Sequence, residues 1–241
     1  MNLVTRSFSP DVIAYFRAGT SDAFVLDEVI ENRIYRRKKI DFDVNPKERW
    51  LDLGANIGAF ALYCRLRGAS TVCFEPDPDC FEILKLNAPS SELRPFAVTA
   101  SYDESLPFWK GKLSNNFSKA TSIKSGNLPK HPSGSLRNLH ASVLQDRVFD
   151  GIKMDIEGSE GELIDQWLLP KCNKLVMEYH SSRDKSIPNL KRRLEILKER
   201  FGVVSYPPEY DRIISEGGNS SYEGSQLTYF DRMIFCKDPR C

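Results

Sequence analysis

The sequence lacks the excess of basic residues that is typical of nucleic-acid-binding proteins, and it lacks the paired cysteines that are typical of metal-binding proteins. Lysine and arginine together number 34 and aspartate and glutamate 33, which leaves a formal net charge of +1. With no basic excess, a nucleic-acid partner would have to rely on a local patch. The six cysteines show no paired metal-ligand spacing. We therefore expect reduced thiols in an intracellular protein.

Long apolar runs are also missing. No N-terminal stretch has the apolar core of a signal peptide, and no run approaches the length of a membrane span. The sequence therefore predicts a protein without a membrane span and with a cytoplasmic location. It leaves the oligomeric state open.

What the sequence does contain is enough apolar material for one sizeable core. Its 241 residues are 41% hydrophobic and 11% aromatic, without internal repeats. We expect a single domain over residues 1–241, with an N-terminal helical segment over residues 1–45. Residues 111–145 are rich in serine, asparagine, lysine and glycine. That composition predicts an insertion loop, either facing the substrate or disordered.

The best-defined motif covers residues 50–60 and reads WLDLGANIGAF. An apolar run reaches Asp52, Gly54 and Gly58 then bracket an asparagine, and an apolar pattern with helical spacing follows. This order predicts a strand, a tight glycine turn and a helix, which together cradle a nucleotide-like ligand in doubly wound α/β domains. About twenty residues on, a second strand ends at Glu75, and an acid at that distance commonly holds the hydroxyls of a ribose.

The spacing of the glycines separates two classes of cofactor. A dinucleotide needs G-x-G-x-x-G, so that its pyrophosphate lies on bare backbone. Here Asn56 stands at the second glycine position and Ala59 at the third. The amide of Asn56 can instead hydrogen-bond an amino-acid group, which favours S-adenosylmethionine over a nicotinamide dinucleotide.

Four stretches of the chain also occur in the order seen in one protein family. They are GANIG at 54–58, FEP at 74–76, IKMDIEGSE at 152–160 and MEYH at 177–180. Through them the chain resembles the FkbM-type methyltransferases over about residues 19–201. The resemblance implies an S-adenosylmethionine-dependent enzyme, and many members are thought to methylate hydroxyls of sugars or polyketides. It also implies that the N-terminal segment acts as a lid, with Glu28 and Tyr35 as candidate lid residues.

From the motifs and the resemblance we expect an α/β, Rossmann-like class I methyltransferase fold. Its sheet would be doubly wound, seven-stranded and mostly parallel, with a reversed last strand. Strands are predicted over residues 96–100, 106–110 (added at the sheet edge), 148–155, 174–180, 203–206 and 229–236, and helices over residues 10–17, 22–30, 78–87, 159–167 and 187–200.

The predicted cofactor-binding residues lie at the ends of the first two strands. They are Asp52, Gly54, Asn56, Gly58, Glu75, Pro76 and Asp77. For Asp77, contact with the ribose and a cap on the following helix are equal alternatives.

Ionisable side chains alternate at the ends of the fourth and fifth strands. Lys153 and Asp155 share one strand face, and Glu178 and His180 share another, so all four are expected to converge beside the methyl site. A sugar hydroxyl must lose its proton as it accepts a methyl group. His180 is the candidate general base, and Asp155, Lys153 and Glu178 are the other catalytic candidates. Alternatively, His180 is only hydrogen-bonded at a strand end, or Asp155, Glu178 and His180 bind a divalent metal ion.

Two other functions remain as alternatives. The Asp/Asn-Pro-Pro-Tyr signature of adenine methylation is missing from the fourth strand, where Asp155-Ile-Glu-Gly158 stands, and this disfavours an RNA or DNA methyltransferase. A non-catalytic module that binds S-adenosylmethionine is the other alternative. The resemblance implies an O-methyltransferase acting on a hydroxyl of a sugar, glycan or secondary metabolite, and we therefore expect a small-molecule or glycan acceptor as partner.

Overall fold

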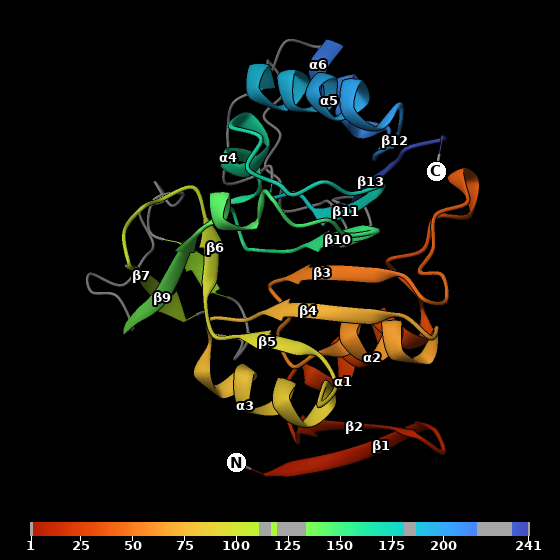
Figure 1. Cartoon of the computed structure of the whole chain (residues 1–241), viewed down its shortest axis with the longest axis vertical. Helices are drawn as coiled ribbons and strands as arrows, with labels where there is room; N and C mark the ends of the chain where they lie inside the picture. The colour runs from red at the N-terminus through yellow and green to blue at the C-terminus, as the bar shows by residue number, and fades with distance from the viewer. Residues whose placement is uncertain (1, 111–116, 120–133, 181–186, 216–232, 241) are drawn as a thin grey trace.

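The computed structural model describes residues 2–110, 117–119, 134–180, 187–215 and 233–240. Within these ranges, the centre of the fold is a seven-stranded sheet with the strand order β12-β13-β11-β10-β3-β4-β5 (Figure 1). Its strands are β3 (Arg49–Leu53), β4 (Ser70–Phe74), β5 (Glu92–Arg94), β10 (Gly151–Met154), β11 (Lys174–Glu178), β12 (Val203–Ser205) and β13 (Met233–Lys237). The five strands from β11 to β5 run parallel, and β13 runs antiparallel to both of its neighbours.

Alternate residues of the strands enter two different apolar cores. Leu51 and Leu53 pack in a core with residues of α4 (Glu160–Asp165) and α5 (Ile187–Phe201). Trp50 packs in a second core with residues of α2 (Ala59–Leu66) and of the N-terminal segment. Because successive side chains of a strand point to opposite faces, both faces of the sheet are covered, as parallel sheets require. This arrangement confirms the α/β class.

The chain begins with a β-hairpin, so the prediction of a helix over residues 10–17 is wrong. Pro10 lies in the turn between the strands, and Val12 and Ala14 are buried at alternate positions. That period of two indicates a strand, and proline after serine signals a turn as readily as a helix start. The hairpin strands are β1 (Leu3–Ser9) and β2 (Val12–Arg17).

The second N-terminal helix is present where the sequence predicted it. It consists of α1 (Asp22–Leu26) continued by a π-helical turn, η1 (Asp27–Glu31). The N-terminal segment is therefore a hairpin followed by a helix, and the expectation of a wholly helical segment over residues 1–45 is corrected.

Asn87, near the end of α3 (Pro78–Asn87), connects the hairpin to the glycine turn. Its side chain accepts a hydrogen bond from the backbone N–H of Tyr15 (2.7 Å) and donates to the carbonyl oxygens of Tyr15 (2.9 Å) and Ile57 (2.6 Å). A buried amide is stable only when it is satisfied in this way. The hairpin is thereby fixed against the turn that follows β3.

A second sheet, with the order β6-β9-β7-β8, lies beside the main one. Residues 96–100 were expected in the main sheet, but its edge is β5 instead, and residues 106–110 pair within the second sheet. The expected loop over 111–145 contributes two of these strands, while residues 111–116 and 120–133 lie outside the described residues. The strands are β6 (Ala97–Thr99), β7 (Ser105–Lys110), β8 (Phe117–Lys119) and β9 (Gly134–His140).

The second sheet escaped prediction because its pairing is non-local. β6 pairs in parallel with β9, about forty residues later in the chain. The buried side chain of Asn138 joins them: it accepts from Thr99 Oγ1 (2.9 Å) and donates to the carbonyl oxygens of Ser101 (2.9 Å) and Asp103 (2.8 Å). None of the helices in the described ranges is long and apolar enough to cross a membrane.

Candidate functional site

The glycine turn after β3 is packed too tightly for a side chain at its two glycines. Gly54 has φ +78°, and a Cβ there would lie 1.9 Å from the backbone oxygen of Asp155. Gly58 has φ +90°, and a Cβ there would lie 2.8 Å from Leu84 Cδ1. Asn56 also has a positive φ, of 52°. Local packing and the positive φ angles therefore favour glycine at both positions, whether or not a ligand binds. The close approach at Gly54 sets the turn against the end of β10.

Glu75 follows β4, and its carboxylate connects the glycine turn to the segment that leads into α3. Its oxygens accept hydrogen bonds from the backbone N–H groups of Asn56 (2.7 Å) and Asp77 (2.8 Å). Burial raises the pKa of Glu75 to about 7, although the two N–H donors oppose that rise. A carboxylate has about four lone-pair sites, so Glu75 keeps capacity for further donors.

A cavity opens between the main sheet and the second sheet, at the carboxyl ends of β3, β4 and β10. Glu75 and Asp155 contribute charge to its lining, and Val98, Leu106 and Leu136 of the second sheet form an apolar wall. The full lining is Gly54, Glu75, Pro76, Phe96, Ala97, Val98, Thr99, Leu106, Pro107, Leu136, Asp155, Ile156, Glu157 and Ser159. Ligands of doubly wound folds bind at this edge of the sheet.

Only some of the predicted cofactor residues line this cavity. Gly54, Glu75 and Pro76 do. Asp77 accepts a hydrogen bond from the backbone N–H of Asp79 (2.7 Å) and so caps α3, which was one of its two alternatives. The apolar wall was missed, because no local signal places residues of β6, β7 and β9 opposite the glycine turn.

Lys153 and Asp52 form a buried ion pair beneath the turn. Lys153 Nζ lies 3.1 Å from Asp52 Oδ1 and donates to the carbonyl oxygen of Gly54 (2.5 Å). Burial alone would lower the pKa of Lys153, but the Asp52 carboxylate keeps it above its usual range. Neither side chain lines the cavity. The pair therefore supports the turn from below.

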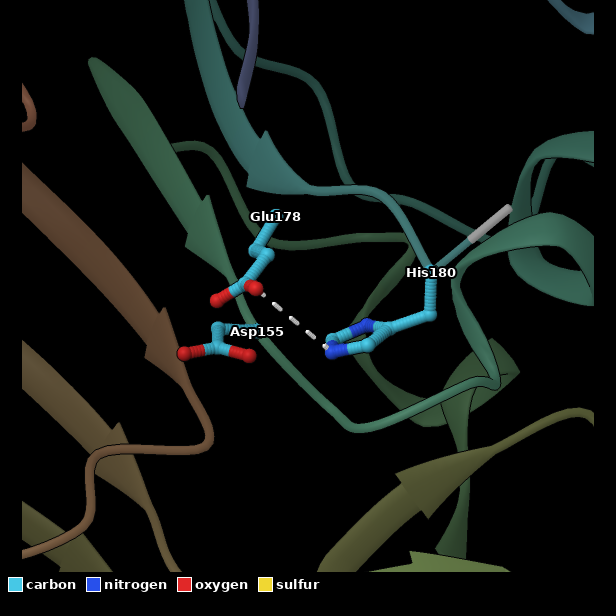
Figure 2. A group of neighbouring side chains, drawn as sticks. All are labelled: Asp155, Glu178 and His180. Carbon is cyan, nitrogen blue, oxygen red and sulfur yellow. Dashed lines mark ion pairs between the residues drawn. The ribbon is translucent and has the colours of Figure 1, made fainter. Parts of the chain in front are cut away.

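Asp155, Glu178 and His180 come together at the ends of β10 and β11, as the sequence predicted. Each offers one ligating atom, and these atoms all lie within 4.8 Å of one another. In Figure 2 the three side chains point toward one another. Glu178 and His180 are buried, and Asp155 is partly buried.

The carboxylate of Glu160, which is not one of these three residues, fixes the orientation of the His180 ring. Glu160 Oε1 lies 2.9 Å from His180 Nδ1 and also accepts from the backbone N–H groups of Ile156 (3.2 Å) and Gly158 (3.1 Å). Since an ionised carboxylate can only accept, Nδ1 carries the hydrogen. The other ring nitrogen, Nε2, therefore faces Glu178 Oε1 at 3.8 Å. Glu160 is thus an acid in the first turn of α4 that also contacts His180.

The acids around His180 alter its titration. Burial alone would lower the pKa of His180, but Glu160, Glu157 and Glu178 together raise it to about 10. Glu157 Oε2 lies 3.4 Å from Nε2. These acids favour the protonated ring, and a protonated imidazole cannot take a proton from an acceptor.

The N-terminal segment reaches the same edge of the sheet. Burial, and then the charge of Asp155, raise the pKa of Glu28 to about 7. Tyr35 is buried against Phe60, with ring centroids 5.1 Å apart, and its ring lies 5.9 Å from Lys153 Nζ. Both candidate lid residues thus lie beside the residues of β10.

Comparison with known proteins identifies the family. The model of the FkbM methyltransferase domain matches residues 52–216. None of the curated protein sequences compared with this chain is significantly similar to it.

Several solved structures are similar in fold at low identity. TYW2 of Pyrococcus horikoshii in complex with MeSAdo has a TM-score of 0.43 at 13% identity, over 85% of this chain and 62% of that one. The tRNA (uracil-54, C5)-methyltransferase of Pyrococcus abyssi with S-adenosyl-L-homocysteine has a TM-score of 0.46 at 10% identity, over 98% and 44%. The 16S rRNA N2 G1207 methyltransferase RsmC of T. thermophilus with AdoMet and guanosine has a TM-score of 0.47 at 11% identity, over 98% and 45%.

This chain spans less than two thirds of the length of each of these three proteins. The family match covers more than half of the chain and includes both the glycine turn and the ends of β10 and β11. The chain therefore belongs to the FkbM methyltransferase family.

Proposed function

We propose that the protein transfers the methyl group of S-adenosylmethionine to a hydroxyl of a sugar, glycan or secondary metabolite. The observation that carries the proposal is the position of Asp155, which lines the cavity with Glu75 and also belongs to the set with Glu178 and His180. One residue therefore borders both the cofactor cavity and the polar groups that would face an acceptor.

The cavity fits the cofactor on the residues present. Glu75 has remaining acceptor capacity for the two hydroxyls of a ribose, and the wall of Val98, Leu106 and Leu136 suits an adenine ring. The turn from Gly54 to Gly58 would hold the methionine end, with the Asn56 amide beside it. When bound, S-adenosylmethionine supplies the electrophilic methyl group.

Asp155 is proposed to receive the acceptor. Its Oδ1 is buried without a hydrogen-bond partner among the described residues, so it is placed to accept a hydrogen bond, and then the proton, from a hydroxyl. His180 and Glu178 would complete the acceptor side, and Lys153 would act through Asp52 and the turn. A positioned base of this kind contributes about 10²- to 10⁴-fold in rate.

The charge of the cavity supports an uncharged acceptor. Among the described residues, its lining contains three carboxylates, Glu75, Asp155 and Glu157, and no lysine or arginine. A nucleic-acid backbone would be repelled by such a surface, whereas a glycan hydroxyl would not. This charge favours an uncharged hydroxyl over RNA or DNA as the acceptor.

Methyl transfer from labelled S-adenosylmethionine tests the proposal. Glycans, hydroxylated small molecules and oligonucleotides would each be incubated with the protein, and the label in each class counted. We expect label in a hydroxylated acceptor, in a form stable to alkali, because a methyl ether resists the hydrolysis that removes a methyl ester. Label confined to oligonucleotides, with binding that falls steeply as salt rises, would contradict the proposal.

A further inference from the structure

Asp155, Glu178 and His180 form a donor set of a kind that binds cations. Two carboxylates and one imidazole lie at the ends of adjacent parallel strands, and one atom from each falls within 4.8 Å of the others (Figure 2). Carboxylate oxygens suit Mg²⁺, Ca²⁺ and Mn²⁺, and an imidazole nitrogen suits Zn²⁺ and later transition metals. A mixed set of one nitrogen and two oxygens points to Mn²⁺ or Zn²⁺.

The orientation of His180 is an independent observation in favour of such a site. Metal-bound histidines almost always donate their other ring N–H to a carboxylate or carbonyl, which fixes the ring. Glu160 accepts from Nδ1 of His180 at 2.9 Å and is itself held by the backbone N–H groups of Ile156 and Gly158. Glu160, which is not part of the donor set, thereby holds Nε2 at 3.4 Å from Glu157 and 3.8 Å from Glu178.

The surrounding charge also favours a cation. Glu28 and Glu157 add two carboxylates beside the set. Lys153 also interacts electrostatically with Asp155, but its ammonium is paired with Asp52, 3.1 Å away, and donates to the Gly54 carbonyl. Asp155 Oδ1 is buried without a hydrogen-bond partner in the described part of the chain. A divalent ion would supply the compensating charge, and one lone pair of Asp155 Oδ1 would bind it while the other stays available for a hydroxyl proton.

We propose that Asp155, Glu178 and His180 bind one divalent cation, Mn²⁺ or Zn²⁺, at the edge of the cofactor cavity. Glu160 is a positioning residue that acts through the His180 ring. Because Asp155 also lines the cavity, the cation would lie where an acceptor hydroxyl enters, and its charge would lower the pKa of that hydroxyl. This last role depends on the proposed function, whereas binding of the cation does not.

Binding of Mn²⁺ to the full chain tests the site without any turnover. Titration followed by electron paramagnetic resonance should show one Mn²⁺ per chain, and calorimetry should show that Zn²⁺ competes for it. We expect His180→Ala and Glu178→Gln to weaken Mn²⁺ binding at least about 10-fold. His140→Ala is the matched control, since His140 lies outside the set and stacks on Tyr102, and it should bind Mn²⁺ as the wild type does.

Further measurements distinguish failure of the cation site from failure of the proposed methyl transfer. S-adenosylhomocysteine binding should survive in His180→Ala, which shows that the variant is folded. Failure of the wild type to bind Mn²⁺ or Zn²⁺, or equal Mn²⁺ affinity in all variants, would overturn the site. Methyl transfer to a hydroxyl at an unchanged rate after chelation would overturn the role of the cation and leave the proposed function intact. Mn²⁺ binding without methylation of any hydroxyl would overturn the proposed function and leave the cation site intact.

Discussion

The carboxylate of Glu75 accepts a hydrogen bond from the backbone N–H of Asn56, 2.7 Å away and nineteen positions earlier in the chain. This contact joins the end of β4 to the middle of the glycine turn. The same carboxylate accepts from Asp77 N–H and lines the cavity. One side chain thus shapes the turn and borders the cavity.

The first prediction concerns the charge of Glu75. Glu75→Gln keeps the shape of the side chain but removes the ionised acceptor for two ribose hydroxyls. Because hydrogen bonds to charged groups contribute about 1.5–3 kcal/mol, we expect S-adenosylhomocysteine to bind about 10-fold more weakly or worse by calorimetry. Glu82→Gln, on the exposed side of α3, is the control and should bind normally. Equal affinity in both variants would remove Glu75 from the cofactor site.

The raised pKa of Glu75 leads to a pH dependence. With the pKa raised to about 7 by burial, the carboxyl is ionised above pH 7 and protonated below it. A protonated carboxyl accepts fewer hydrogen bonds, so affinity for S-adenosylhomocysteine should fall as pH is lowered from 8 to 6. A single titrating group limits the fall to about tenfold for each pH unit below its pKa. The slope should be absent in Glu75→Gln, and a slope that persists there would assign the effect to another group.

The two glycines Gly54 and Gly19 allow a matched test of the turn. Both have positive φ, but a Cβ at Gly54 would meet the Asp155 carbonyl at 1.9 Å, whereas nothing lies within 4 Å of a Cβ at Gly19. We expect Gly19→Ala to cost about 1 kcal/mol of unfolding free energy, and Gly54→Ala about 3 kcal/mol or more, since a backbone clash is added. Urea denaturation measures both. Equal costs would show that the turn can move away from β10.

Lys153 offers a test that separates support from catalysis. Lys153→Met leaves Asp52 buried without its partner, and breaking such a pair costs about 3–5 kcal/mol. The double variant Asp52→Leu with Lys153→Met removes both charges and should recover most of the lost stability. If the double variant is stable and still transfers methyl groups, Lys153 acts only through the fold. Recovered stability with no turnover would instead give the ammonium a direct part in the reaction.

Features of the site could be predicted from the sequence where the residues that form them are close together along the chain or lie at the ends of neighbouring strands. The strand, turn and helix at residues 50–60 and the acid at residue 75 are local, and their spacing alone indicates a ligand site. Asp155 and His180 could be brought together because neighbouring parallel strands end at one edge. The meeting of these side chains at one edge of the sheet could therefore be predicted from the sequence.

Other parts of the site rest on contacts that leave no local signal. The parallel pairing of β6 with β9, which builds the apolar wall, joins segments on either side of a long polar stretch. The hydrogen bond between Glu160 and His180 spans twenty positions. In the sequence, Glu160 looks only like the acid that commonly occurs in the first turn of a helix. The N-terminal hairpin was missed for another reason, because a serine–proline pair begins helices and turns alike.

The most direct test of the central claim is the Asp155→Asn variant, assayed both for S-adenosylhomocysteine binding and for methyl transfer to a hydroxylated acceptor. If Asp155 borders the cofactor cavity but acts on the acceptor, the substitution should reduce methyl transfer and leave S-adenosylhomocysteine binding largely intact. We predict near-normal binding and a loss of about 100-fold or more in turnover, the effect of removing a positioned base. Turnover within a fewfold of the wild type would contradict the account, because the acceptor would then react without the residue that links the two halves of the site.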